Sequence, residues 1–105
     1  MTAKSRKEQI QEMLVEDAND PFLRYGLAME FVSEGNDAEA VRQFRQLFTA
    51  TPEYVAAYHQ AGQALLRLGK PGDAREVLRL GIAMALKRGE QHTAEEMQAL
   101  LDGLE

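Results

Sequence analysis

Apolar residues recur along most of the chain at the three- and four-residue spacing that is typical of amphipathic helices. Glycines and prolines separate these stretches: Pro21, Gly35, Pro52, Gly69, Pro71 and Gly89. Proline is favoured in the first turn of a helix, and glycine just after the last. The pattern therefore predicts an all-α chain of about six helices.

Residues 21–52 predict a first pair of helices. Asp20 can cap a helix that begins at Pro21 and ends at Gly35, and Asn36 with Glu39 offers a cap for the next. The apolar positions expected to face the core are Phe22, Tyr25, Leu27, Ala28, Phe31 and Val32, then Ala40, Val41, Phe44, Leu47 and Phe48. Small residues such as Ala28 and Ala40 predict a close crossing of the two helices, because a larger side chain would force them apart.

Residues 53–88 repeat this plan. We expect Thr51 to cap a helix that opens at Pro52 and breaks at Gly69, and Pro71 to open another that stops at Gly89. Their apolar positions are Tyr54, Val55, Tyr58, Ala61, Leu65 and Leu68, then Ala74, Val77, Leu78, Ile82 and Leu86.

One further helix is predicted at each end of the chain. Ser5 with Glu8 forms a capping box ahead of an N-terminal helix over 5–17, and Thr93 with Glu96 forms one ahead of a helix over 93–104. The last helix carries apolar residues at i, i+3, i+4 and i+7, enough to cover one face of the preceding pair. Residues 1–105 are predicted to form one domain.

The two central helix pairs match each other at a shift of 34 residues. Small residues align with small, large apolar with large, and glycine with glycine: Ala28 with Gly62, Phe31 with Leu65, Gly35 with Gly69, Ala40 with Ala74, Phe44 with Leu78, and Phe48 with Ile82. With Leu27, Pro52, Tyr58 and Ala61, this pattern resembles the tetratricopeptide repeat. Two repeats are then expected, over 21–52 and 53–88. The sequence departs from the family at Arg24, where a large apolar residue is usual, at Gly81, where alanine is usual, and at Leu86, where a proline closes the repeat.

The resemblance implies a right-handed solenoid of helical hairpins that binds a peptide or helix of a partner protein without catalysis. In this family the first helix of each pair lines a concave face. The residues carried over to that face are Tyr25, Met29, Val32 and Ser33, then His59, Gln60, Gln63, Leu66 and Arg67, with Met97 or Leu101 closing one side. The alternative is that Tyr25, Met29 and Val32 are core residues covered by the N-terminal helix. A chaperone-binding clamp is not expected, because Tyr25 and Met29 stand where that clamp needs lysine and asparagine.

Composition argues against most other functions. The chain has no cysteine and two histidines, which predicts neither a metal site nor a cofactor. Carboxylates lie on faces expected to be solvated, and no catalytic motif is present, so we predict no enzyme and no catalytic residues. The net charge of −5 disfavours nucleic acid, and no apolar run reaches the roughly 18 residues of a membrane span, so a cytoplasmic protein is expected.

Charge is spread unevenly along the chain. Residues 8–39 carry nine acidic residues and one basic residue, whereas residues 67–88 carry six basic and two acidic. A solvated helical surface would explain this, and so would head-to-tail association of copies. The alternatives to a peptide-binding adaptor are therefore a self-associating module, such as a homodimer formed through the terminal helices, and a subunit of a larger bacterial assembly.

Overall fold

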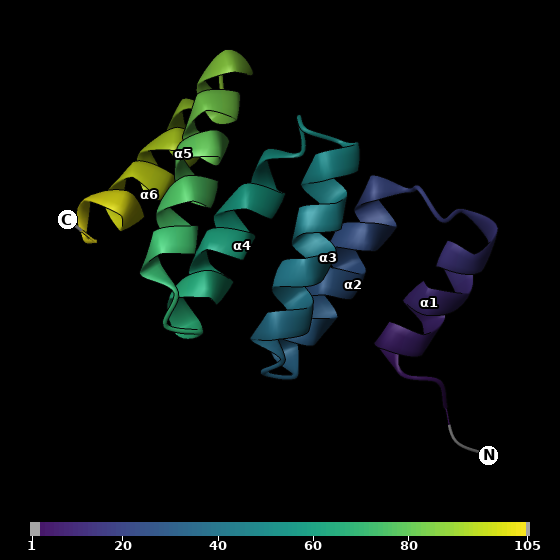
Figure 1. The fold of residues 1–105 in the computed structure, drawn as a ribbon. Coiled ribbons are helices and arrows are strands. Elements are labelled where there is room, and N and C mark those ends of the chain that lie inside the picture. Colours follow the sequence, from purple (N-terminus) through teal and green to yellow (C-terminus); the bar gives the residue numbers. More distant parts are fainter. Residues whose placement is uncertain (1–2, 105) are drawn as a thin grey trace.

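The computed structural model describes residues 3–104, which form a stack of six α-helices joined by short turns (Figure 1). They are α1 (Arg6–Glu16), α2 (Pro21–Ser33), α3 (Asp37–Ala50), α4 (Val55–Arg67), α5 (Pro71–Lys87) and α6 (Gln91–Asp102). Each helix packs mainly on its neighbours in sequence, and the stack measures 51 × 28 × 20 Å. The all-α prediction, with hairpins stacked in sequence order, is confirmed.

Three glycine turns set the geometry of the hairpins. Gly35, Gly69 and Gly89 have φ of 75°, 73° and 73°, a left-handed conformation that costs glycine little. At each turn the residue after the glycine donates its amide to the carbonyl five residues before it, at 2.8–2.9 Å. This bond pattern closes a helix and reverses the chain within two residues. The same turn recurs after α2, α4 and α5, which makes the hairpins alike.

Two helix starts differ from the prediction. The third helix begins at Val55 rather than Pro52, because residues 51–54 form a turn in which the amide of Tyr54 donates to the carbonyl of Thr51 at 3.0 Å. The last helix begins at Gln91, capped by Glu90, so Thr93 lies inside it. The glycine turn at 89 leads directly into α6 and leaves no room for a longer loop.

The core runs along the stack between the layer of α2, α4 and α6 and the layer of α3 and α5 (Figure 1). Its largest fully buried side chains are Phe44, Leu78, Met97 and Val77. Small residues allow close approach there: a Cβ added at Gly62 would lie 2.6 Å from Cδ2 of Leu78. The predicted close crossing of helices at small residues is confirmed.

Three apolar residues expected in the core are instead exposed. Phe22 is 75% exposed, Leu86 52% and Leu68 37%. Leu86 and Leu68 stand at the last turns of their helices, where no neighbouring helix covers them. Phe22 lies in the first turn of α2, and α1 does not reach over it.

The N-terminal helix is attached to α2 by its own small cluster. Ile10 and Leu14 bury themselves against Leu27, with Leu23 and Phe31 packed around them. Two ion pairs add to this contact, Arg6 with Glu30 at 3.0 Å and Lys7 with Glu34 at 2.8 Å. Arg24, which replaces the expected apolar residue, donates from Nε to the carbonyl of Ala18 at 2.8 Å and so fastens the α1–α2 loop.

Candidate functional site

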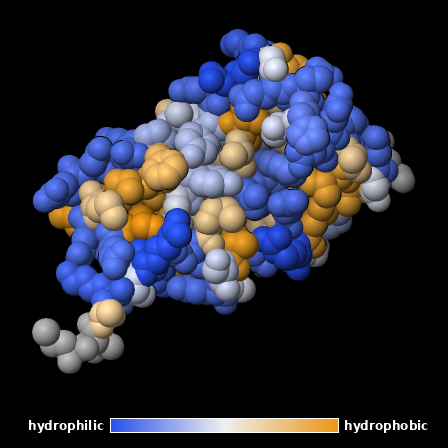
Figure 2. Space-filling view, turned by 180° about the vertical axis from the view of Figure 1, so that it is seen from behind, coloured by the Kyte–Doolittle hydropathy of each residue, from blue (hydrophilic) through white to orange (hydrophobic). Residues whose placement is uncertain are grey.

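The face formed by α2, α4 and α6 corresponds to the binding surface that the repeat pattern predicts. These helices make up one layer of the stack (Figure 1), and Figure 2 shows the molecule from their side. Apolar side chains gather there at the end formed by α1 and α2, next to paler and more polar side chains toward the middle (Figure 2). We refer to this surface as the α2–α4–α6 face.

A pocket of about 530 Å³ opens between α1 and α2 at this end. Its lining residues come from both helices: Arg6, Gln9, Ile10 and Met13 from α1, and Phe22, Leu23, Tyr25, Gly26 and Met29 from α2. Met13 is 49% and Phe22 75% exposed, so apolar surface is available to a ligand at the rim. This α1–α2 pocket is large enough for one bulky apolar side chain.

The N-terminal helix leaves the predicted binding residues uncovered. Its buried side chains pack on Leu23, Leu27 and Phe31, which lie on another side of α2. Tyr25 and Val32 instead pack against the main core and stay half-buried, and Met29 lies in the wall of the α1–α2 pocket. The α2–α4–α6 face is therefore open in this structure.

Tyr25 links the pocket to α4. Its ring lies 5.8 Å from that of Phe44 and 5.4 Å from that of Tyr54, centroid to centroid, which fixes its orientation. Burial, and to a smaller extent Tyr54, raises the pKa of the Tyr25 hydroxyl, while a side-chain hydrogen bond with Gln60 opposes that shift. The hydroxyl is therefore protonated at neutral pH and couples the pocket wall to the polar residues of α4.

The α4 residues form a polar row beside this tyrosine. His59, Gln60 and Gln63 are all half-buried, and His59 and Gln63 stand one helical turn apart. Amide and imidazole groups so placed can donate to, and accept from, a peptide backbone. Leu66 is half-buried on the same helix, and Ser33 is exposed at the end of α2.

Arg67 is already engaged in an intramolecular ion pair. Its Nε and Nη2 donate to Oδ1 of Asp37 at 3.0 and 2.9 Å, so the guanidinium joins the end of α4 to the start of α3. A ligand that recruited this guanidinium would have to displace Asp37. The structure thus gives Arg67 a role between the two hairpins that the helical spacing did not reveal.

Two pocket residues were missed by the sequence reasoning. Phe22 was assigned to the core, and Met13 was grouped with Ile10 and Leu14 on a buried face. One signal was present, because Phe22 and Met29 are seven residues apart and therefore share one side of α2. Their exposure depends on how far α1 reaches along α2, which helical spacing does not encode.

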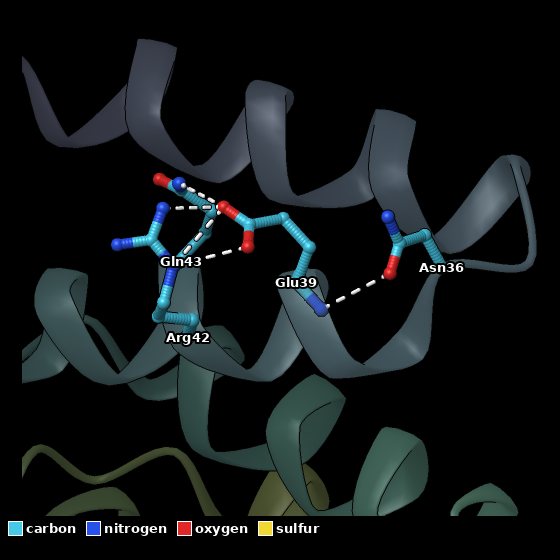
Figure 3. Close-up of polar contacts among 4 residues, drawn as sticks. All are labelled: Asn36, Glu39, Arg42 and Gln43. Carbon is cyan, nitrogen blue, oxygen red and sulfur yellow. Dashed lines mark hydrogen bonds and ion pairs between the residues drawn. The ribbon is translucent and has the colours of Figure 1, made fainter.

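A second polar cluster lies at the start of α3 (Figure 3). The amide of Glu39 donates to Oδ1 of Asn36 at 3.3 Å, which is the predicted cap. The Glu39 carboxylate accepts from Nε of Arg42 at 3.0 Å and from Nε2 of Gln43 at 3.0 Å, and these bonds lower its pKa to about 2. Gln43 is 6% exposed, and its Oε1 finds no hydrogen-bond partner among the described residues. The cluster caps and stiffens α3, away from the α1–α2 pocket.

Two further searches covered the same part of the chain. Among residues 3–104 no three histidine or carboxylate side chains are grouped so that they could hold a metal ion. None of the helices in that range combines the length and the apolar character that crossing a bilayer requires.

Several bacterial proteins are similar to this chain. A TPR repeat-containing protein of Pseudomonas aeruginosa is 26% identical over 98 residues, which is 93% of each chain. The solution structure of a tetratricopeptide repeat domain protein from Salinibacter ruber is 34% identical, with a TM-score of 0.77 over 82% of this chain and 87% of that one. A crystal structure of a tetratricopeptide repeat domain protein from the same organism is 33% identical, with a TM-score of 0.75 over 81% of this chain and 94% of that one. The solution structure of a protein from Bordetella parapertussis is 25% identical, with a TM-score of 0.84 over 97% and 89%. No protein-family model matches the chain.

Proposed function

This chain belongs to the tetratricopeptide-repeat family, and on that premise we propose that it is a non-catalytic adaptor that binds a peptide or helix of a partner protein on its α2–α4–α6 face. Modules of this family generally serve protein–protein interaction. The partner is expected to be a protein segment rather than a nucleic acid, because the net charge of −5 repels phosphates.

The observation that carries this proposal is the α1–α2 pocket beside a row of hydrogen-bonding side chains. A side chain as exposed as Phe22 at the rim of an apolar pocket is typical of recognition surfaces. Tyr25 belongs to the pocket and also bonds to Gln60, so the apolar and polar parts are continuous. A ligand would place one bulky apolar side chain in the pocket and pair its backbone with Gln63 and His59.

The residues differ in how cleanly they test this idea. Gln63 makes no recorded contact that holds the fold together, so Gln63→Ala should weaken ligand binding while leaving stability nearly unchanged. Arg67→Ala would also break the ion pair with Asp37, and a weaker interaction in that variant would have two explanations. Phe22→Ala is the sharper variant, because little area is lost from the core when a 75% exposed ring is removed.

The experiment uses a displayed library of random peptides selected on the intact chain, followed by fluorescence-polarisation titration of one selected peptide. Phe22→Ala and Met29→Ala should each weaken that peptide about tenfold, since loss of a well-packed apolar anchor costs roughly 1.4 kcal/mol. Leu86→Ala is the matched control: this side chain is also largely exposed, at 52%, but lies on α5. Equal affinity in all three variants, or a library that yields no binder, would refute the proposal.

A further inference from the structure

The two ends of the stack lack a neighbour on one side. Among residues 3–104, α1 makes its main contact with α2, and α6 contacts α5 and, less extensively, α4. The termini of the stack lie at opposite ends of its long axis (Figure 1). Each end therefore presents helix surface that an adjoining hairpin would cover in a longer array.

The first end is acidic. The basic residues of α1, Arg6 and Lys7, point toward α2 and pair with its carboxylates. The opposite side of α1 carries Glu12 and Glu16, one turn apart, with Val15 between them at 84% exposure. Glu12 also pairs with Lys4, so the acidic surface is partly balanced.

The other end is predominantly basic. A shallow hollow of about 580 Å³ lies on the outer side of α5. Its lining residues are Gly72, Arg75, Glu76, Arg79, Leu80 and Ala83. Leu80 is 52% exposed, and Arg75 reaches the carbonyl of Leu104 at 3.3 Å, which joins this surface to the end of α6.

We propose that the outer face of α1 docks in the α5 hollow of a second copy of this chain. Glu12 and Glu16 are four residues apart, as are Arg75 and Arg79, so both pairs have the same spacing of about 6 Å along their helices. The exposed Val15 then lies against the apolar part of the hollow. Opposite charges around a small apolar centre are typical of a specific contact.

The contact joins two different surfaces, so it is head-to-tail and leaves a free end on each copy. It is also small, because α1 spans only about 16 Å and covers well under the roughly 1,600 Å² of a standard interface. We expect association at high micromolar concentration in 20 mM salt. It should weaken at least tenfold in 500 mM salt, where charges are screened beyond about 4 Å.

The test is sedimentation equilibrium of the full chain at 20–500 µM in both salts. The variant E12Q/E16Q should be monomeric in low salt, although it makes the net charge less negative and so lowers general repulsion between copies. R75Q/R79Q should also be monomeric. Glu76→Gln removes the acidic residue of the hollow and should strengthen association several-fold. Circular dichroism checks that each variant folds.

Mixing gives a sharper outcome. E12Q/E16Q retains a working hollow and R75Q/R79Q retains a working α1, so an equimolar mixture should form complexes of two chains and no larger. Exchanging the charges in one chain, E12K/E16K with R75E/R79E, should restore the assembly of the original sequence.

Two results would overturn the proposal. One is a wild-type chain that stays monomeric at 500 µM in low salt, which would leave these surfaces to a different partner. The other is E12Q/E16Q that associates as well as wild type, which would place any self-contact elsewhere. Phe22→Ala should leave self-association unchanged, so the adaptor proposal and this one can fail separately.

Discussion

Gly81 is the position where one added carbon should most disturb the packing. It stands where the family usually has alanine, yet a Cβ placed on it would lie 2.5 Å from Cβ of Tyr58 and 2.7 Å from Sδ of Met97. Ordinary carbon–carbon contacts are about 3.5–4.0 Å. Gly81→Ala therefore requires α4 and α5 to separate by about 1 Å, since a Cβ atom cannot move away without its backbone.

The expected loss follows from two opposing terms. Alanine inside a helix is favoured over glycine by about 1 kcal/mol. Overpacking a tight core costs typically 1–3 kcal/mol, and here the upper part applies because Tyr58 and Met97 are 5% and 0% exposed. We expect Gly81→Ala to lose roughly 1–2 kcal/mol of unfolding free energy, which corresponds to a fall of about 5–10 °C in Tm.

Urea denaturation followed by circular dichroism at 222 nm measures this change. The midpoint should fall with little change in slope, as expected if the native state alone is strained. Gly72→Ala is the matched control in the same helix, because a Cβ there meets no atom within 4 Å. It should leave stability unchanged or raise it. If Gly81→Ala proved as stable as wild type, the close approach of α4 and α5 would be wrong.

The remaining predictions concern polar contacts. The carboxyl of Glu39 should titrate near pH 2 by NMR and move toward its ordinary value in Arg42→Gln; because its pKa is lowered in the folded state, its contribution to stability is present above about pH 4.5 and is lost as the pH falls toward 2. A double-mutant cycle of Asp37→Asn and Arg67→Gln should give a coupling of about 0.5 kcal/mol that disappears in 1 M salt, since the arginine is 44% exposed; no coupling in low salt would argue against the pair. Tyr58→Phe should lower the unfolding free energy by about 1 kcal/mol in urea denaturation, because a buried hydroxyl loses its 2.7 Å bond to the loop before α4, whereas an unchanged midpoint would show that water replaces it.

The repeat itself could be predicted from the sequence because its determinants are local. The turns need glycine at 35, 69 and 89 for a left-handed residue, whatever surrounds them. Periodic apolar positions then fix which side of each helix is buried, and a period of 34 residues fixes how the hairpins correspond. The candidate face followed from the same helical phase, and its assignment to partner binding remains a prediction.

The site was less predictable because its properties depend on distances between helices. Helical spacing made Phe22 resemble a core residue, but α1 is too short and too tilted in its contacts to cover it. Arg67 was assigned to the binding face by phase alone, while its partner Asp37 lies thirty residues away in sequence.

By itself, then, the sequence determined the helices, their turns and the order of the stack, since each of these depends on residues within a few positions of one another. The tertiary structure alone decided that α1 packs on one side of α2 and leaves a pocket on another, that Arg67 is held by Asp37, and that Gly81 must lack a side chain. These outcomes depend on the separation of helix surfaces, which is set by every packed side chain together and by no local pattern.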